Sequence, residues 1–417
     1  MNIVHIVQLY HPVATGSARY FIEISARLAA EGHRVTVVAT DAYDLEHFWM
    51  AGKRRAEPPE ELHRGVRIVR LPVRRAPGPP ILYPVLRRLM VELGRVPGSA
   101  PLLRRMATIT PRLPGLPAQL AGGPVDLIHT TNITLDFAIV PAWRMARQRG
   151  IAFFCTPLMH LGEPGDQSLA RYYSMPHQID MLRTSDRVLT MTDIERGYLA
   201  GRGVPAERLR RVGVGVSPDE VAGGDGQRFR AEHGIVGQMV LAIGAMARDK
   251  GTPHVVEAMQ RLWDAGSDAT LVLIGAPLEH FTAFYQQLPP QHKAKIVLLP
   301  YAPEQTKRDA LAAATLLALP SRTDSFGIVF LEAWLYGLPV IGARAGGIPD
   351  VVAEGQDGLL VPFAAPDELA SAIGALLADP ARASAMGAAG RAKVLREYTW
   401  DSVYARVRAA YDEVLGS

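Results

Sequence analysis

The segment that decides the fold reads Pro320-Ser-Arg-Thr-Asp-Ser-Phe-Gly-Ile-Val-Phe-Leu-Glu-Ala-Trp-Leu-Tyr-Gly-Leu-Pro339. The short apolar run 315–319 before it ends at a proline, which predicts a buried strand. Asp324 is expected to cap a helix that ends at Gly337, because glycine suits the residue after a helix and Pro339 cannot continue it. The helix N-terminus then opens at the carboxyl end of the strand, where open α/β sheets bind ligands.

The turn before this helix has the features of an anion site. Backbone N–H groups at a helix N-terminus, together with the helix dipole, favour a phosphate. These N–H groups belong to Ser325, Phe326, Gly327 and Ile328.

Two carboxylates, Asp324 and Glu332, flank the turn with seven residues between them. If Asp324 caps the helix, Glu332 lies about 12 Å further along its axis. A glycosidase pair needs about 5–10 Å between its carboxyl groups. The longer spacing suits one elongated ligand with a sugar at one end, a ribose at the other and a diphosphate between them. The alternative is that Asp324 only caps a helix and Glu332 lies on a solvated face.

This stretch resembles the E-x7-E signature of retaining glycosyltransferases of family 4 (glycosyltransferase group 1), with Asp324 in place of the first Glu. The resemblance implies an α/β GT-B fold, in which two Rossmann-like domains with parallel sheets face each other across a cleft. It implies that Asp324 contacts the transferred sugar and that Glu332 binds the ribose of the nucleotide. The expected parts are an acceptor-side domain at 1–215, a nucleotide-sugar domain at 216–395, and a C-terminal helix at 396–417 that returns to the first domain.

In the first half, the loop after strand 3–9 resembles the family's loop opposite the diphosphate. Gly16 matches the first glycine of the family's pair, and Ser17 replaces the second. His160 stands where the family has a histidine that points at the transferred sugar, although a loop histidine is more often structural. Glu163 and Asp166 are candidates for acceptor contacts from their position alone.

In the second half, Lys250 matches the lysine with which the family clamps the diphosphate. Ala245 stands where the family has an arginine, and Arg248 is the candidate replacement. Tyr301 follows strand 296–299, where the family commonly reads the nucleotide base. The glycine pair at 346–347 is expected to come close to the donor.

The 417 residues are 48% apolar and 21% charged, which suits two domains of a globular protein. The single cysteine, Cys155, lies in an apolar run and is expected to be a core residue. We expect neither a signal peptide nor a membrane span, and therefore a cytoplasmic protein. No Asp-x-Asp pair or His/Cys cluster is present, so we expect no metal and no cofactor besides the nucleotide-sugar substrate.

The net charge of +4 is unevenly distributed, because residues 64–112 hold eleven Arg and one acid. Within this segment, Leu82, Leu86, Leu89 and Met90 are expected to share one helical face beside Arg87 and Arg88. Such a segment can touch the inner face of an anionic membrane or hold a phosphorylated acceptor. A solvated arginine-rich loop is an equal alternative. Nucleic acid is disfavoured because no aromatic interleaving accompanies the basic run.

The resemblance implies a retaining transfer of a hexose from a UDP- or GDP-sugar to an unidentified hydroxyl acceptor. We expect front-face displacement, because no carboxylate of the motif is placed to act as a nucleophile. The acceptor is a small molecule, a saccharide or a lipid-linked compound. One alternative is an epimerase or hydrolase of nucleotide sugars with the same fold. Another is a non-catalytic nucleotide-sugar binder, which Ala245 and Thr131 would suit because they replace family residues. A dehydrogenase is disfavoured because no G-x-G-x-x-G follows the first strand.

Overall fold

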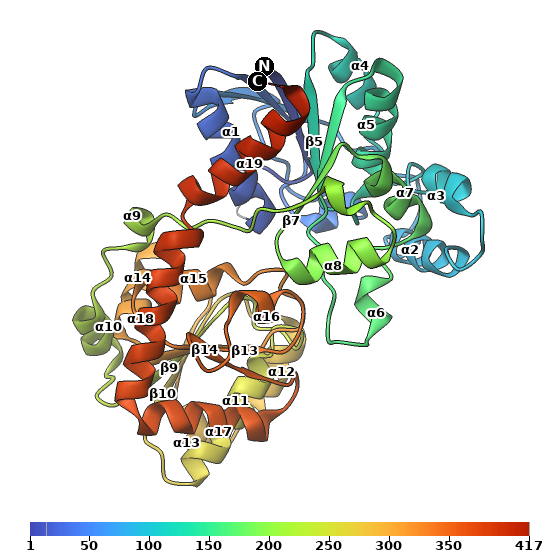
Figure 1. Cartoon of the computed structure of the whole chain (residues 1–417). Helices are drawn as coiled ribbons and strands as arrows, with labels where there is room; N and C mark the ends of the chain where they lie inside the picture. The colour runs from blue at the N-terminus through green and yellow to red at the C-terminus, as the bar shows by residue number, and fades with distance from the viewer. Residues whose placement is uncertain (14, 417) are drawn as a thin grey trace. The chain divides into compact units, whose positions relative to one another are not determined.

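The computed structural model describes residues 1–13 and 15–416 of the chain (Figure 1). The chain divides into two compact units. Unit 1 contains Met1–Met159, Gln167–Gly213 and the chain from Tyr404 onward, and unit 2 contains His160–Asp166 and Val214–Val403. The short loop His160–Asp166 therefore leaves unit 1 in the sequence and makes its contacts in unit 2.

Unit 1 is built on a sheet that, within the described residues, has eight strands in the order β3-β4-β2-β1-β5-β6-β7-β8. Adjacent strands are parallel except for the edge pair β3–β4, which is antiparallel. The strands are β1 (Asn2–Val7), β2 (Arg34–Thr40), β3 (Glu60–His63), β4 (Val66–Leu71), β5 (Leu127–Thr131), β6 (Ala152–Thr156), β7 (Arg187–Thr190) and β8 (Leu209–Arg211). Cys155 in β6 is buried as predicted, and burial raises the pKa of its thiol to about 12.

The helices of unit 1 cover both faces of this sheet (Figure 1). They are α1 (Gly16–Ala30), α2 (Leu82–Leu93), α3 (Ala100–Met106), α4 (Leu116–Ala121), α5 (Asp136–Arg149), α6 (Gln167–Ala170), α7 (Pro176–Thr184), α8 (Asp193–Gly201) and most of α19 (Trp400–Leu415), with short 3-10 turns at Leu45–Phe48 and Ala206–Arg208.

Helix α2 buries an arginine and leaves most of its leucines exposed or half-buried. Arg87 is buried, and its guanidinium Nη1 lies 2.8 and 2.9 Å from the two carboxylate oxygens of Asp136 on α5. Met90 is buried beside it, whereas Leu82 and Leu89 are exposed by 40% and 50%. The predicted helix is therefore present, and the buried ion pair offsets the cost of desolvating Arg87 while Leu82 and Leu89 lie outside.

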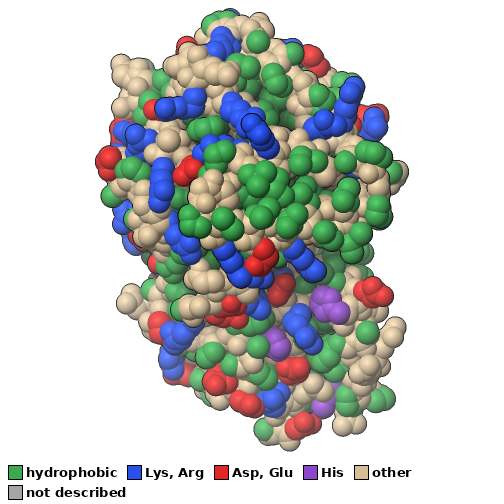
Figure 2. Space-filling model, turned by 90° about the vertical axis from the view of Figure 1, so that its right-hand side faces the viewer, with side chains coloured by type: hydrophobic (Ala, Val, Ile, Leu, Met, Phe, Trp, Pro, Cys, Tyr) green, Lys and Arg blue, Asp and Glu red, His purple; other side chains and the backbone are tan. Residues whose placement is uncertain are grey.

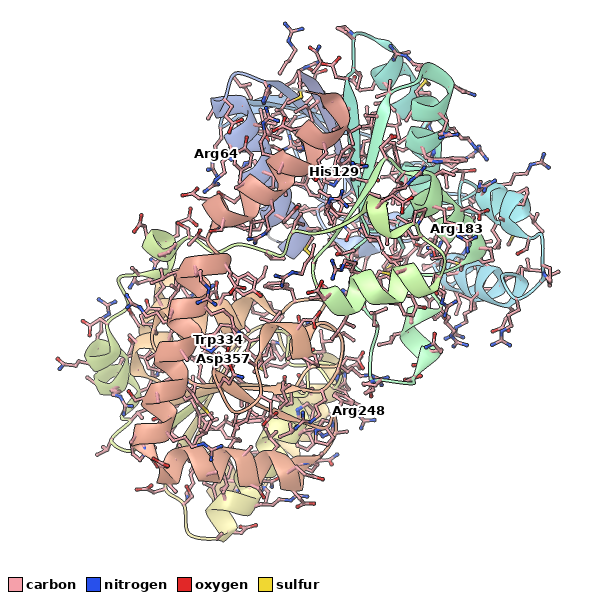
Figure 3. The ribbon with its side chains drawn as sticks, viewed as in Figure 1. Arg64, His129, Arg183, Arg248, Trp334 and Asp357 are labelled. Carbon is pink, nitrogen blue, oxygen red and sulfur yellow. The ribbon has the colours of Figure 1, made fainter. Side chains whose placement is uncertain are left out.

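The C-terminal helix is joined to the sheet of unit 1 by a buried polar network. The Tyr411 hydroxyl on α19 lies 3.1 Å from His5 Nε2 and 2.6 Å from His129 Nδ1. The other ring nitrogens lie 2.7 Å from the hydroxyls of Ser25 and Thr156. His129, in the middle of β5, is labelled in Figure 3. The network satisfies these polar groups without water and fixes where α19 packs.

Unit 2 is built on a sheet of six parallel strands within the described residues, in the order β11-β10-β9-β12-β13-β14. The strands are β9 (Met239–Ile243), β10 (Thr270–Ile274), β11 (Ile296–Leu299), β12 (Leu316–Leu319), β13 (Val340–Ala343) and β14 (Gly358–Val361). Its helices are α9 (Pro218–Val221), α10 (Gly226–His233), α11 (Thr252–Asp264), α12 (Glu279–Gln286), α13 (Pro290–Lys293), α14 (Glu304–Ala313), α15 (Ile328–Leu335), α16 (Ile348–Val351), α17 (Pro366–Ala378) and α18 (Pro380–Glu397).

Both units therefore have the doubly wound α/β arrangement that the sequence predicts. In unit 2, one face of the sheet and the helices α11 and α17 share a core that includes Val240, Leu271 and Leu316. Among the described residues, no helix is both long and apolar enough to pass through a bilayer.

Candidate functional site

The turn between β12 and α15 begins as predicted with a buried strand, but its helix starts later. The first helical residue is Ile328, and its N-cap is Gly327 at a φ of 86°. A Cβ at this position would lie 2.6 Å from the ring of Phe330, so both conformation and space require glycine. The prediction that Asp324 caps the helix is wrong, because the chain from 324 to 327 is not helical. The predicted spacing of the two carboxylates therefore loses its helical basis.

The backbone of this turn presents several N–H groups together. Within the described residues, none of four successive N–H groups donates a hydrogen bond to the protein: Ser325, Phe326, Gly327 and Ile328. The Phe326 ring is buried and packs edge-on against Tyr398 at 5.3 Å between ring centres. The turn is thus anchored while its N–H groups keep their capacity to bind an anion.

A second turn, between β9 and α11, is hydrogen-bonded to the first. The Arg322 N–H donates to the Asp249 carbonyl at 2.9 Å. Gly251, at a φ of 75°, lies so close that a Cβ would come within 2.3 Å of the Pro320 carbonyl oxygen. Because β9 and β12 are adjacent parallel strands, their carboxyl ends meet at one edge of the sheet and bring the two turns together.

This contact brings together Lys250 and Asp324, which the sequence predicts as phosphate and sugar contacts. Lys250 Nζ lies 2.9 Å from Asp324 Oδ1, and both side chains are mostly buried. Asp324 Oδ2 is buried and has no hydrogen-bond partner among the described residues. A buried carboxylate oxygen without a donor is costly, so this atom is suited to accept a hydrogen bond from a bound hydroxyl group.

His160 joins this group from the loop that precedes α6. Burial lowers the pKa of His160 to about 4; the Asp324 carboxylate opposes this shift and Lys250 adds to it. The imidazole is therefore neutral near pH 7 and has one donor and one acceptor nitrogen.

The loop that carries His160 is fastened to the same turn. The Gly346 N–H donates to the Gly162 carbonyl at 2.7 Å, and the next N–H, of Gly347, donates to the Asp324 carbonyl at 3.0 Å. This places the predicted glycine pair against the β12–α15 turn.

Arg322 forms ion pairs with Glu163 at 3.0 Å and Asp166 at 2.9 Å. The predicted acceptor role of these two carboxylates stays a prediction. Reasoning from the sequence missed Arg322, although it lies within the quoted segment.

Glu332, predicted to bind the ribose, lies on α15 and pairs with Lys307 Nζ at 3.0 Å. Lys307 also lies 2.8 Å from Glu304. Burial favours the neutral amine, but the two carboxylates outweigh it and raise the pKa of Lys307. Helix α15 is anchored by Trp334, whose Nε1–H donates to the Asp357 carbonyl at 2.8 Å (Figure 3). Lys307 was missed because it comes from α14, whose sequence has no pattern linking it to Glu332.

Three other predicted donor residues have different surroundings. Gly16 belongs to unit 1, where it is the first residue of α1 behind a Thr15 cap. Arg248 is exposed in the β9–α11 turn (Figure 3), and its backbone N–H donates to His280 Nε2 at 2.8 Å. Tyr301 is 76% exposed just after β11. Their roles toward a donor stay predictions.

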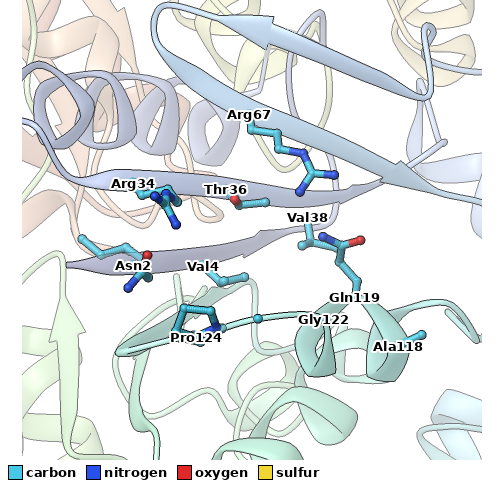
Figure 4. Close-up of a pocket in the computed structure, with 13 residues that line it drawn as sticks. Asn2, Val4, Arg34, Thr36, Val38, Arg67, Ala118, Gln119, Gly122 and Pro124 are labelled. Atoms are coloured by element: carbon cyan, nitrogen blue, oxygen red, sulfur yellow. The ribbon is translucent and has the colours of Figure 1, made fainter.

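A pocket of about 360 Å³ lies in unit 1, and none of the predicted site residues lines it (Figure 4). Its lining includes Asn2 and Arg34, the first residues of β1 and β2. It therefore lies at the amino ends of these strands, whereas ligands of open α/β sheets bind at the carboxyl ends. Among the described residues, no group of three or more His, Cys, Asp or Glu is placed to hold a metal ion.

Comparison with known families covers most of the chain. Residues 227–393 match the model described as "Glycosyl transferases group 1", and residues 15–215 match "Glycosyl transferase 4-like domain". The chain belongs to the group 1 glycosyltransferases of the family 4 type. The β12–α15 segment lies inside the first match, and Gly16 and His160 lie inside the second.

Curated relatives of this glycosyltransferase share between 26% and 35% of the aligned residues. An alpha-maltose-1-phosphate synthase of Mycolicibacterium smegmatis is 35% identical over 188 residues, which cover 42% of this chain and 48% of the relative. A D-inositol 3-phosphate glycosyltransferase of Segniliparus rotundus is 32% identical over 55% of this chain and 54% of the relative. The chain thus matches about half the length of these two curated relatives. A D-inositol 3-phosphate glycosyltransferase 1 of Catenulispora acidiphila is 26% identical, and the alignment covers 95% of this chain and 90% of the relative.

Solved structures establish the fold. Sucrose-phosphate synthase from Thermosynechococcus elongatus superposes with a TM-score of 0.75 at 20% identity, covering all of both chains. Anabaena Alr3699/HepE superposes with a TM-score of 0.70 at 17% identity, over 99% of this chain and all of the other. The predicted GT-B α/β fold is confirmed.

Proposed function

We propose that this glycosyltransferase moves a hexose from a nucleoside-diphosphate sugar to a hydroxyl acceptor with retention of anomeric configuration. One observation carries the proposal. At one edge of the unit 2 sheet, Lys250, a buried carboxylate oxygen of Asp324 and a row of backbone N–H groups lie together. Lys250 and the N–H groups suit a diphosphate, and the carboxylate oxygen suits a sugar hydroxyl.

In this proposal the bond between C1 of the sugar and the diphosphate oxygen breaks as the acceptor oxygen bonds to C1 on the same face. The acceptor proton passes to the departing phosphate oxygen. Lys250 and the N–H groups of the β12–α15 turn stabilise the charge that develops on the diphosphate. Neutral His160 and Asp324 orient the sugar, and Glu332 holds the ribose hydroxyls.

Several relatives suggest the classes of donor and acceptor to test. One, at 29% identity over 54% of this chain, is named a GDP-mannose-dependent alpha-(1-6)-phosphatidylinositol monomannoside mannosyltransferase. Others are named after maltose 1-phosphate and inositol 3-phosphate. The donor base and sugar stay open between UDP- and GDP-hexoses, and the acceptors to test are sugar phosphates, inositol phosphates and phosphatidylinositol.

The test is a melting-temperature panel of UDP-, GDP- and ADP-hexoses, followed by product analysis with the stabilising donor, the acceptor panel and EDTA. We expect one nucleotide series to raise the melting temperature, because a ligand that binds the native state stabilises it. Transfer with retention should then follow in EDTA. Rapid stoichiometric turnover of donor without acceptor would instead indicate an epimerase or hydrolase. Tight binding with no product from any acceptor would indicate a non-catalytic binder.

A further inference from the structure

The surface around α2 and α3 in unit 1 concentrates exposed apolar side chains. Of the thirteen large apolar side chains that are exposed among the described residues, seven lie within residues 81–109. They are Ile81, Leu82, Val85, Leu89, Val96, Leu102 and Ile109, exposed by 40% to 65%. In Figure 2, apolar side chains gather in the upper half of the view, and Lys and Arg side chains border them. Single exposed leucines need no explanation, but such a cluster marks an interaction surface.

Three of these side chains form a stripe along α2. Leu82, Val85 and Leu89 are spaced three and four residues apart, so they lie on one helical face. The opposite face is fixed in the core by Met90 and by the buried pair of Arg87 with Asp136. Helix α2 therefore cannot rotate to bury the stripe without taking Arg87 away from its carboxylate, which would leave a buried charge without its partner.

Positive charge surrounds the stripe. Arg88 and Arg105 are exposed, and neither has an ion-pair partner among the described residues. At the C-terminal end of α2, the side chains of Arg95, Arg171 and Arg202 line a pocket of about 250 Å³.

The lining of this pocket combines apolar residues with an excess of positive charge. Two of the three arginines that line the pocket form ion pairs with the same carboxylate, that of Glu92, which lies 2.8 Å from Arg95 and 3.9 Å from Arg171. Arg202 donates to the amide oxygen of Gln167 at 3.0 Å and lies over the Tyr198 ring at 4.9 Å, and within the described residues no carboxylate pairs with it. The apolar residues Val91, Met175 and Pro176 also line the pocket. A pocket with this lining suits the phosphate of a lipid headgroup, and the acyl chains of the lipid would then lie beside the stripe on α2.

We propose that this surface, the α2–α3 face, binds an anionic phospholipid bilayer. A soluble phosphorylated ligand would occupy the pocket but leave the stripe in water. A second copy of the chain would set arginines against arginines, because a two-fold interface places the same patch on both sides. A bilayer with anionic headgroups satisfies both features, since it offers negative charge at the surface and hydrocarbon just beneath. The proposal concerns unit 1 by itself and does not depend on the donor.

The test is sedimentation of the whole protein with vesicles of phosphatidylcholine alone or of equal parts phosphatidylcholine and phosphatidylglycerol, without nucleotide sugar. We expect binding to the anionic vesicles that weakens as salt is raised. Arg88→Gln and Arg95→Gln should each reduce partitioning about fivefold at low salt. The double variant Val85→Glu/Leu89→Glu should reduce it by at least about tenfold.

The matched control is Val236→Glu, which charges a valine that is 97% exposed in unit 2 and should bind like the unmodified protein. Thermal unfolding of each variant checks that it folds. Equal or absent binding to the two kinds of vesicle would overturn the proposal. So would a double variant that binds as well as the control. A concentration-dependent dimer that Val85→Glu/Leu89→Glu abolishes, with no vesicle binding, would assign the face to a second copy instead.

Discussion

Replacing Glu332 with Gln removes one negative charge from α15 and keeps the shape of the side chain. The Glu332 side chain is 16% exposed, and its carboxylate lies 3.0 Å from Lys307 Nζ. If this carboxylate holds the ribose, the substitution weakens its hydrogen bonds to the two hydroxyls. A hydrogen bond to a charged group contributes about 1.5–3 kcal/mol, and one between neutral groups about 0.5–1.5 kcal/mol. Two such bonds predict a loss of roughly 2–3 kcal/mol, which raises the Kd for the nucleotide about 30- to 150-fold.

The same substitution should affect folding much less. Lys307 keeps its second carboxylate, Glu304, at 2.8 Å, so its charge is not left alone. Because the pair with Glu332 is partly exposed, we expect a loss of about 1 kcal/mol of unfolding free energy. For a unit of this size that lowers the melting temperature by roughly 2–4 °C.

Calorimetric titration with UDP and GDP measures the affinity, and steady-state kinetics separates KM from kcat. Because the ribose does not react, its contact is equal in the ground state and the transition state, so KM should rise while kcat stays unchanged. The control is Glu304→Gln, which removes the other partner of Lys307 at a 74% exposed side chain and should leave nucleotide affinity intact. Unchanged affinity in Glu332→Gln, with the small expected loss of stability, would refute the ribose assignment.

Three further outcomes follow from the structure. Asp324→Asn should lower kcat/KM with the donor about 10- to 100-fold, because the buried carboxylate oxygen binds the sugar in our proposal. The affinity for the free nucleotide should change little, and an equal loss of that affinity in calorimetry would contradict the assignment. Tyr411→Phe removes the hydroxyl group to which His5 and His129 are both hydrogen-bonded, and it should lower the unfolding free energy of unit 1 by about 2–4 kcal/mol in guanidinium unfolding. A loss under about 1 kcal/mol would contradict a stabilising role of these hydrogen bonds. Burial lowers the pKa of His5 to about 3 and that of His129 well below its usual value, so below about pH 6.5 the unfolded chain takes up protons that the native unit does not, and unfolding free energy falls by about 2 kcal/mol per histidine by pH 5. Burial also raises the pKa of Glu195 to about 7, which opposes one of these contributions and leaves a net loss of roughly 2 kcal/mol from these three groups of unit 1 between pH 7 and pH 5. His160 in unit 2, with its pKa lowered to about 4, adds a loss of the same sign, so unfolding curves should show lower stability at pH 5 than at pH 7.

Much of the fold follows from local sequence patterns. The strand predicted at 296–299 is β11 with the same bounds, and the run predicted at 315–319 is β12 with one residue fewer, because each is a short apolar segment between turn residues. The end of α15 was predicted for the same kind of reason, since Gly337 has a φ of 72° that few other residues adopt. The start of α15 was not predicted correctly. An aspartate suits both a helix N-cap and an ion pair with a lysine, and the sequence alone does not show that Asp324 pairs with Lys250.

The family and the types of residue at the site could also be inferred from the sequence, since they depend on motif spacing within single turns. Which groups pair across turns was decided by tertiary structure. Lys250 meets Asp324 only because β9 and β12 are neighbours in the sheet, and Glu332 meets Lys307 only because α14 and α15 lie close together. The inward turn of Arg87 was likewise decided by Asp136, which is 49 residues away in the chain. A sequence pattern describes what each segment prefers alone, whereas charge pairing and burial depend on which segments the fold brings into contact.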